Sequence, residues 1–277
     1  MTDRPPEPCH TAHLFRPLLG ELLAVLRGLA DEDWQRQTLA PQWKVRDVAA
    51  HLLDGDLRKL SFHRDAHMLE LDKPPTTERE ITALVNALNA AGVAYAARLS
   101  PRTIVDLLEV TGGWVADFVE RLPPHGGARF GVSWAGEEES ENWLDTGREY
   151  TERWHHQMQI RDATSRPLLL GPEWLEPLLD ISVRALPHAF RSVDAAVGTE
   201  LTLEVSGETE GAWTLARAEG GWQVRRGRSA APRTTVRMTA DHAWRMFYNA
   251  LRDESLIQVE GDWALAAPLL RTRSVIV

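Results

Sequence analysis

The sequence predicts two domains of different class, a helical one followed by one that mixes helices and strands. Apolar residues recur with a helical period over His13–Leu29, whereas apolar and polar residues alternate over Glu200–Ser206, as in a half-buried strand. Between these regions the chain carries Ser165-Arg-Pro167 and then Gly171-Pro172, residues that interrupt regular structure. We therefore expect an all-α bundle over residues 1–165 and an α+β domain over residues 166–277.

Apolar periodicity and helix breakers set the expected helices of the first domain. Pro74-Pro75 ends the second helix and Pro123-Pro124 ends the fourth, because proline disfavours helix in the residue before it. A polar loop, residues 130–139, separates the fourth helix from the fifth. The expected helices span residues 13–29, 45–71, 81–99, 103–122 and 142–163.

The second domain is expected to open with a helix and continue as a sheet. Gly220-Gly221 lies between two alternating runs and predicts a hairpin, and Thr239 can cap a helix that follows the last of these strands. The expected helices span residues 173–193, 239–251 and 261–270, and the expected strands span residues 200–206, 212–217, 221–226, 234–239 and 274–277.

Composition excludes several classes of function. The 277 residues are 43% hydrophobic and carry a formal net charge of −9, without a Lys/Arg cluster long enough to follow nucleic acid. The single cysteine, Cys9, rules out an internal disulfide and a multi-cysteine metal site. No apolar run approaches the length of a membrane span, and the N-terminus lacks the pattern of an export signal. We expect a cytoplasmic protein with no membrane and no nucleic-acid partner.

One segment places metal-binding side chains at helical spacing. Glu152 and His156 lie four residues apart in a stretch without Gly or Pro, so a helix would present both on one face, where they can bind the same ion. A catalytic zinc-type ion usually takes three protein ligands and leaves one position open. His51 is the best third donor, because it borders the apolar stripe of its own predicted helix, which begins at Val45.

Plainer interpretations of these residues stay open. A Glu four residues before a His is common as a simple charge pair, and a single His beside an apolar stripe is often a hydrogen-bonded core residue. His63 and His67 form a rival pair, also four residues apart. Because His67 would lie about 160° around the helix from His51, we interpret the rival pair as surface residues.

Four short segments give the chain a family resemblance. They are Leu29-Ala-Asp-Glu-Asp33-Trp34, Trp43-Lys-Val-Arg-Asp47-Val-Ala-Ala-His51-Leu52, Glu152-Arg-Trp-His-His156-Gln-Met-Gln-Ile160 and Val259-Glu-Gly261-Asp262-Trp-Ala-Leu-Ala. The first three resemble the metal-binding domain of mycothiol-dependent maleylpyruvate isomerases, a branch of the DinB-like four-helix bundles. The last is similar to the sterol-carrier-like domain often attached to that domain. In order, these segments span nearly the whole chain.

The resemblance implies a divalent metal on His51, Glu152 and His156, usually zinc, with nickel and manganese as alternatives. The chain departs from the family at Gln159, where members often carry Asp. The family's substrate-handling arginine has no motif here. Arg271 and Arg273 are the candidates, and Arg245 offers a further cation.

An ion on two imidazoles and one carboxylate keeps a net positive charge and an open position, which stabilises a bound thiolate or hydroxide. The resemblance implies that mycothiol or another low-molecular-weight thiol supplies the sulfur. We expect a metal-dependent, thiol-using transferase or isomerase acting on a small electrophilic substrate. A metal-dependent hydrolase with Glu149 as base and a non-catalytic small-ligand-binding protein remain alternatives. Both a monomer and a homodimer are compatible with the sequence.

Overall fold

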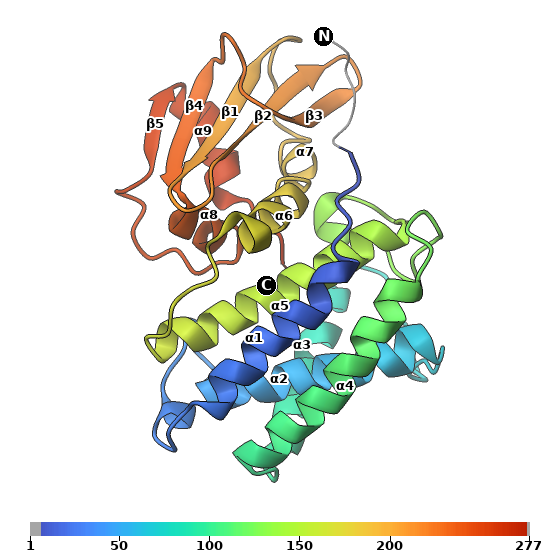
Figure 1. The fold of residues 1–277 in the computed structure, drawn as a ribbon. Helices are drawn as coiled ribbons and strands as arrows, with labels where there is room; N and C mark the ends of the chain where they lie inside the picture. The colour runs from blue at the N-terminus through green and yellow to red at the C-terminus, as the bar shows by residue number, and fades with distance from the viewer. Residues whose placement is uncertain (1–6, 276–277) are drawn as a thin grey trace. The chain divides into compact units, whose positions relative to one another are not determined.

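The structure, a computed structural model, describes residues 7–275 and confirms the expected order of a helical region followed by a sheet with helices (Figure 1). The chain divides into two compact units, described separately below. The helical unit comprises His10–Arg129 and Glu141–Leu168, and the sheet unit comprises residues 7–9, 130–140 and 169–275. The polar loop, which the sequence placed among the helices, is thus part of the sheet unit. Within the described residues, no helix is both long and apolar enough to cross a membrane.

Long helices build the helical unit. They are α1 (Phe15–Arg27), α2 (Val45–Arg58), α3 (Glu78–Ala96), α4 (Pro101–Arg121) and α5 (Asn142–Ala163), labelled in Figure 1. Two 3-10 turns, Ala12–Leu14 and Asp33–Gln35, precede α1 and α2, and a π-helical segment, Lys59–Arg64, extends α2.

Four of these helices share one apolar core, and α3 packs against α2. Leu26 of α1, Val48 of α2, Leu108 of α4 and Ile160 of α5 are each at most 2% exposed. Burying a side chain of this size stabilises the folded state by about 1.5–3 kcal/mol. The core therefore holds together the two helices, α2 and α5, that carry the predicted metal ligands.

Local signals fix where α2 begins and ends. The backbone N–H of Lys44 donates to the Asp47 carboxylate over 3.0 Å, which caps the helix and starts it nearly two turns before His51. The predicted continuation to residue 71 is wrong beyond Arg64. Ala66 adopts the left-handed conformation, with φ of 55°, and this turn ends the helical stretch well before the prolines.

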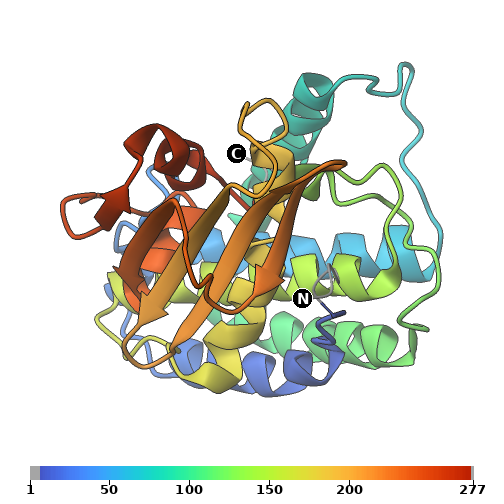
Figure 2. The same cartoon turned by 90° about the horizontal axis from the view of Figure 1, so that it is seen from above.

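The sheet unit combines a five-stranded sheet with helices. Its elements are a 3-10 turn (Ser133–Ala135), α6 (Pro172–Ser182), α7 (Ala185–Ala189), β1 (Glu200–Ser206), β2 (Gly211–Ala218), β3 (Gly221–Arg226), β4 (Thr234–Thr239), α8 (Ala240–Phe247), β5 (Gln258–Gly261) and α9 (Trp263–Arg271). The strand order is β3-β2-β1-β4-β5. The β1 and β4 strands pair in parallel and the other neighbours are antiparallel. Figure 2 shows the strands side by side.

Alternation along β1 decides which side of the sheet is buried. Leu201, Leu203 and Val205 on one side are at most 2% exposed, while the other side carries the partly exposed Glu200 and Glu204 around a buried Thr202. The helices α7, α8 and α9 pack against strands of this sheet.

Three sequence expectations for this unit differ from the structure. The single helix over residues 173–193 is interrupted between α6 and α7, because Pro187 has no N–H with which to continue a helical ladder. Strand β5 was not predicted, because its four residues are mostly exposed and carry no alternation. At the C-terminus residues 274–275 are not in a strand, and the remainder of the predicted strand lies outside the described residues.

Candidate metal centre

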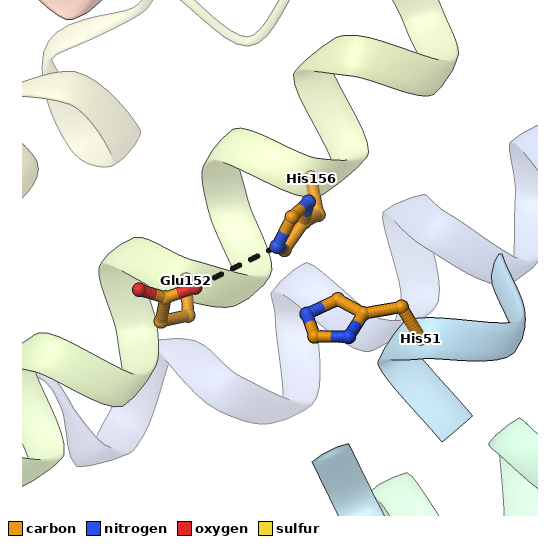
Figure 3. Close-up of side chains that lie close together, drawn as sticks. All are labelled: His51, Glu152 and His156. Carbon is orange, nitrogen blue, oxygen red and sulfur yellow. Dashed lines mark ion pairs between the residues drawn. The ribbon is translucent and has the colours of Figure 1, made fainter. Parts of the chain in front are cut away.

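The packing of α2 against α5 brings the three predicted ligands together (Figure 3). His51, Glu152 and His156 each offer one ligand atom, and these atoms all lie within 4.8 Å of one another. The Nε2 atom of His156 is 3.6 Å from a carboxylate oxygen of Glu152, and the rings of His51 and His156 meet edge to face with centroids 4.5 Å apart. The spacing of four residues on α5 and the position of His51 on α2 thus produce one cluster of donors.

A hydrogen bond selects the tautomer of His156. The Nδ1 atom of His156 lies 2.9 Å from the amide oxygen of Gln159. An amide oxygen only accepts, so Nδ1 carries the proton and the lone pair of Nε2 faces Glu152. The Nδ1 atom of His51 is buried and has no hydrogen-bond partner among the described residues, while the other ring nitrogen points toward Glu152 and His156 (Figure 3).

The electrostatics place His51 and Glu152 in the forms that a metal ion binds. Burial, followed by the proximity of His156, lowers the pKa of His51 well below its ordinary range, so this imidazole is neutral at pH 7. Burial opposes the ionisation of Glu152, but the nearby imidazoles of His156 and His155 lower its pKa to about 2. A neutral imidazole and an ionised carboxylate are the species that coordinate a divalent ion.

Two aromatic rings pack around the imidazoles. The ring of His155 stacks on His156 with centroids 3.9 Å apart, and its Nδ1 donates to the carbonyl of Thr151 over 3.0 Å. The Trp43 indole lies over His51 at 4.7 Å between centroids. These contacts restrict the orientation of both ligand rings.

The rival histidine pair lies outside the cluster. His67 is exposed, in the segment that follows the π-helical residues. The prediction that His63 is a surface residue is wrong, because its side chain is only 12% exposed and its Nδ1 lies 3.7 Å from Asp145. The π-helical geometry of residues 59–64 was not visible in the sequence, and it turns His63 toward α5 rather than toward solvent.

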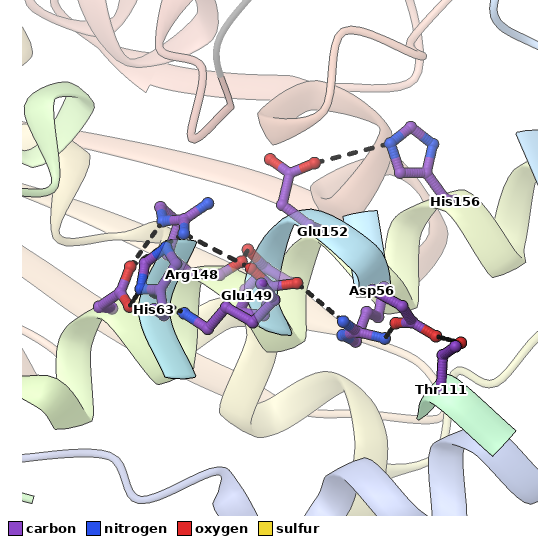
Figure 4. A network of polar contacts seen from close by, with 11 residues as sticks. Asp56, His63, Thr111, Arg148, Glu149, Glu152 and His156 are labelled. Atoms are coloured by element: carbon purple, nitrogen blue, oxygen red, sulfur yellow. Dashed lines mark hydrogen bonds and ion pairs between the residues drawn. The ribbon is translucent and has the colours of Figure 1, made fainter. Parts of the chain in front are cut away.

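The hydrolase alternative requires Glu149 as a base, and the structure engages this carboxylate in ion pairs (Figure 4). Arg153 donates to Glu149 over 3.0 Å and Arg148 approaches it at 3.5 Å. Burial opposes its ionisation, but these cations and Lys59 lower the pKa of Glu149 to about 2. A carboxylate held ionised so firmly is a weak general base at neutral pH.

Two of the candidate arginines, Arg245 and Arg273, make contacts within the sheet unit, and the third, Arg271, is exposed. Arg245 pairs with Asp241 at 2.9 Å and lies over the ring of Trp244. Arg273 donates to the side-chain oxygen of Asn249 and to the carbonyls of Leu270 and Thr272.

Comparisons with known proteins agree with the motifs. Residues 15–161 match the family model described as "Mycothiol maleylpyruvate isomerase N-terminal domain". No curated protein sequence matches the chain. Among solved structures, two crystal structures of the mycothiol-dependent maleylpyruvate isomerase, one of them of a histidine-to-alanine mutant, are similar in fold. They are 12% and 11% identical to this chain, each with a TM-score of 0.55, and each match covers 90% of this chain and 91% of the other.

The family model spans residues 15–161, more than half of the chain, and it contains all three predicted ligands. The resemblance that the sequence motifs suggested is therefore confirmed. The protein belongs to the family of the mycothiol maleylpyruvate isomerase N-terminal domain.

Proposed function

We propose that the protein is a metal-dependent enzyme that uses a low-molecular-weight thiol, mycothiol or one like it, to isomerise or modify a small electrophilic substrate. The observation that carries this proposal is the cluster of two imidazoles and one carboxylate with ligand atoms within 4.8 Å of one another. When bound, a divalent ion there would supply the positive charge that converts a thiol into the nucleophilic thiolate.

The donor set fits zinc. His51, Glu152 and His156 supply two nitrogens and one oxygen, the number of protein ligands that a catalytic zinc site takes while keeping one position open. Gln159 holds the Nδ1 proton of His156 and so presents its Nε2 lone pair to the cluster. Nickel and manganese accept the same donors, so the choice of metal is a matter for elemental analysis.

The sulfur of the reaction comes from outside the chain in this proposal. Cys9 is the only cysteine, and burial together with the charge of Asp180 raises its pKa to about 12. At neutral pH it is therefore protonated and a poor nucleophile. An external thiol drawn from the cytoplasmic pool supplies the thiolate instead.

The test combines metal analysis with turnover. Protein purified without added metal should contain close to one equivalent of zinc or a related ion, and turnover of maleylpyruvate or a similar activated cis-alkene should require both this metal and added mycothiol. Turnover that is independent of thiol would favour the hydrolase, and the absence of turnover with intact metal binding would favour a binding protein. Protein that takes up no divalent ion at all would refute the proposal.

A further inference from the structure

A continuous row of charged side chains lies inside the helical unit, beside the metal ligands (Figure 4). On α5 the row follows the helical spacing of three and four residues through Asp145, Arg148, Glu149, Glu152, Arg153 and His156. Both Glu152 and His156 are proposed ligands. The other four residues have no role in binding the ion.

Two buried ion pairs connect this row to the helix that carries His51. Arg153 Nη1 lies 2.5 Å from Asp56 of α2, whose side chain is fully buried. Lys59 Nζ, at the start of the π-helical segment, lies 2.7 Å from Asp145, and these two side chains are 2% and 4% exposed. Thr111 of α4 donates a hydrogen bond of 2.7 Å to the remaining oxygen of Asp56.

The ion pairs and the metal ligands follow one register. His51 faces Glu152 and His156, Asp56 faces Arg153, and Lys59 faces Asp145, so residue numbers rise along α2 as they fall along α5. The two helices are therefore antiparallel, and the Asp56–Arg153 pair lies about 7.5 Å along α2 from His51, five residues at 1.5 Å each.

Stability alone does not explain these pairs. The free energy needed to remove two charges from water is about as large as the free energy gained from their attraction. Apolar side chains of similar size therefore often replace a buried ion pair without loss of stability. Ion pairs differ from apolar contacts in being directional, whereas an apolar interface tolerates small shifts and repacking.

Direction matters here because the ligands come from two helices. A slide of α2 against α5 by one residue moves His51 by about 1.5 Å, whereas metal–ligand distances tolerate about 0.2 Å. A slide by even a fraction of a residue would therefore move His51 out of coordination distance of the ion.

We propose that Asp56, Arg153, Lys59 and Asp145 are positioning residues that fix the register of α2 against α5 and so set the spacing of the three ligands. This inference rests on the proposed metal site.

The test replaces one pair by apolar side chains in the full-length protein. The double variant Asp56→Leu/Arg153→Met removes one charge of each sign, and Glu149 keeps Arg148 as a partner. We expect the metal-free variant to keep the unfolding midpoint of the native metal-free protein. Its zinc Kd, measured by chelator competition, should weaken by about 10- to 100-fold, the range seen when groups that orient metal ligands are removed. The absorption bands of bound Co²⁺, which report ligand geometry, should also change.

A matched control uses an ion pair that connects α5 to a helix without a ligand. Arg161 of α5 pairs with Glu21 of α1 at 2.6 Å. The variant Glu21→Gln should leave both the zinc Kd and the Co²⁺ spectrum as in the native protein. If the double variant does not fold, Arg153→Lys gives the same readouts, because lysine keeps the charge but lacks the planar fork that holds Asp56 and Glu149 together.

The outcomes separate this inference from the proposed function. A folded double variant with the native zinc Kd and the native Co²⁺ spectrum overturns the register role but leaves the metal site standing. If Arg153→Lys is the variant that is measured, native values of both readouts overturn the role in the same way. Native protein that binds no zinc, or a His156→Ala variant with unchanged zinc binding, overturns the metal site and with it the inference.

Discussion

The two units bury different kinds of side chain. In the helical unit the buried residues include Asp56, Lys59, Asp145 and Arg161, together with two histidines of α5. Across the described part of the sheet unit, the buried polar side chains are all Ser and Thr, such as Thr202 and Thr214, which share a hydrogen bond across β1 and β2. Titratable groups are thus concentrated where the proposed chemistry lies, while the sheet unit buries groups that add packing without charge.

The sheet unit keeps its charges on the outer side of the sheet. Arg237 pairs with Glu204 at 3.0 Å and with Glu260 at 2.7 Å, and all three side chains are at least one-fifth exposed. Exposed pairs of this kind contribute little to stability. The comparison predicts that substitutions in the helical interior change metal binding, whereas substitutions in the sheet interior change stability alone.

The largest functional effect should come from removing a ligand. We expect His51→Ala to lose metal binding by more than the 10- to 100-fold typical of an outer partner, and thiol-dependent turnover should fall to background. Metal analysis and turnover assays measure both. The double variant His63→Ala/His67→Ala is the control, since neither side chain belongs to the cluster. Metal loss in that control would show that the wrong histidines were assigned.

The largest effect on stability should come from the sheet core. Trp213 is 2% exposed and its indole N–H donates to Asp180 over 2.8 Å. Trp213→Ala should lower the free energy of unfolding by about 3–5 kcal/mol, as measured by denaturant titration with circular dichroism. The folded fraction should keep its full metal content. A folded Trp213→Ala protein that has lost its metal would contradict the prediction that substitutions in the sheet interior change stability alone.

Acid should test the charged interior of the helical unit. Burial opposes the ionisation of Asp145, but Arg148 and Lys59 hold its pKa well below the ordinary range. A carboxyl with a lowered folded pKa adds stability that is complete above its unfolded pKa, near 4, and is lost as the pH falls below that value toward the folded pKa. The stability advantage of the native protein over Asp145→Asn should therefore be constant from about pH 6 to 7 and shrink below about pH 4.

A surface carboxylate provides the reference for that acid titration. Asp117 pairs with Arg16 at 2.5 Å, and both side chains are about half exposed. We expect Asp117→Asn to change the free energy of unfolding by less than about 0.5 kcal/mol at every pH. If the difference in the free energy of unfolding between the native protein and Asp145→Asn instead grew as the pH fell, the Asp145 carboxyl would not be held ionised.

Sequence reasoning succeeded where the signal is local. The alternation of β1 predicted its strand to the residue, and the apolar period of α1 predicted its helix to within two residues at each end, because each pattern repeats within one segment. The ligand cluster was also accessible, because Glu152 and His156 occupy one face of a single helix. The third proposed ligand, His51, was chosen because it borders the apolar stripe of its own helix, and the family resemblance supported that choice.

The features that sequence reasoning missed depend on contacts between segments. Nothing near Lys59 in the sequence indicates a π-helical segment, which forms where Lys59 and His63 meet Asp145 of another helix. The short strand β5 exists because its backbone pairs with β4, and its own residues carry no alternation. The charge spacing along α5 was visible, but which charges are buried depends on α2 and α4.

The smallest predicted effect concerns the residue at which this chain departs from the family motif. Gln159 accepts the Nδ1 proton of His156 with a neutral amide. The variant Gln159→Glu would replace this acceptor by a carboxylate, which strengthens the hydrogen bond and makes Nε2 a better electron donor to a bound ion. Zinc should then bind more tightly, but by less than about tenfold, since the ligand atoms themselves are unchanged.

Chelator competition at pH 7 measures the change in the zinc Kd. The variant Gln159→Leu, which removes the acceptor, should move the zinc Kd in the opposite direction. If Gln159→Glu weakened zinc binding and Gln159→Leu left it unchanged, Nδ1 of His156 would not be the donor, and the tautomer assigned to this ligand would be wrong.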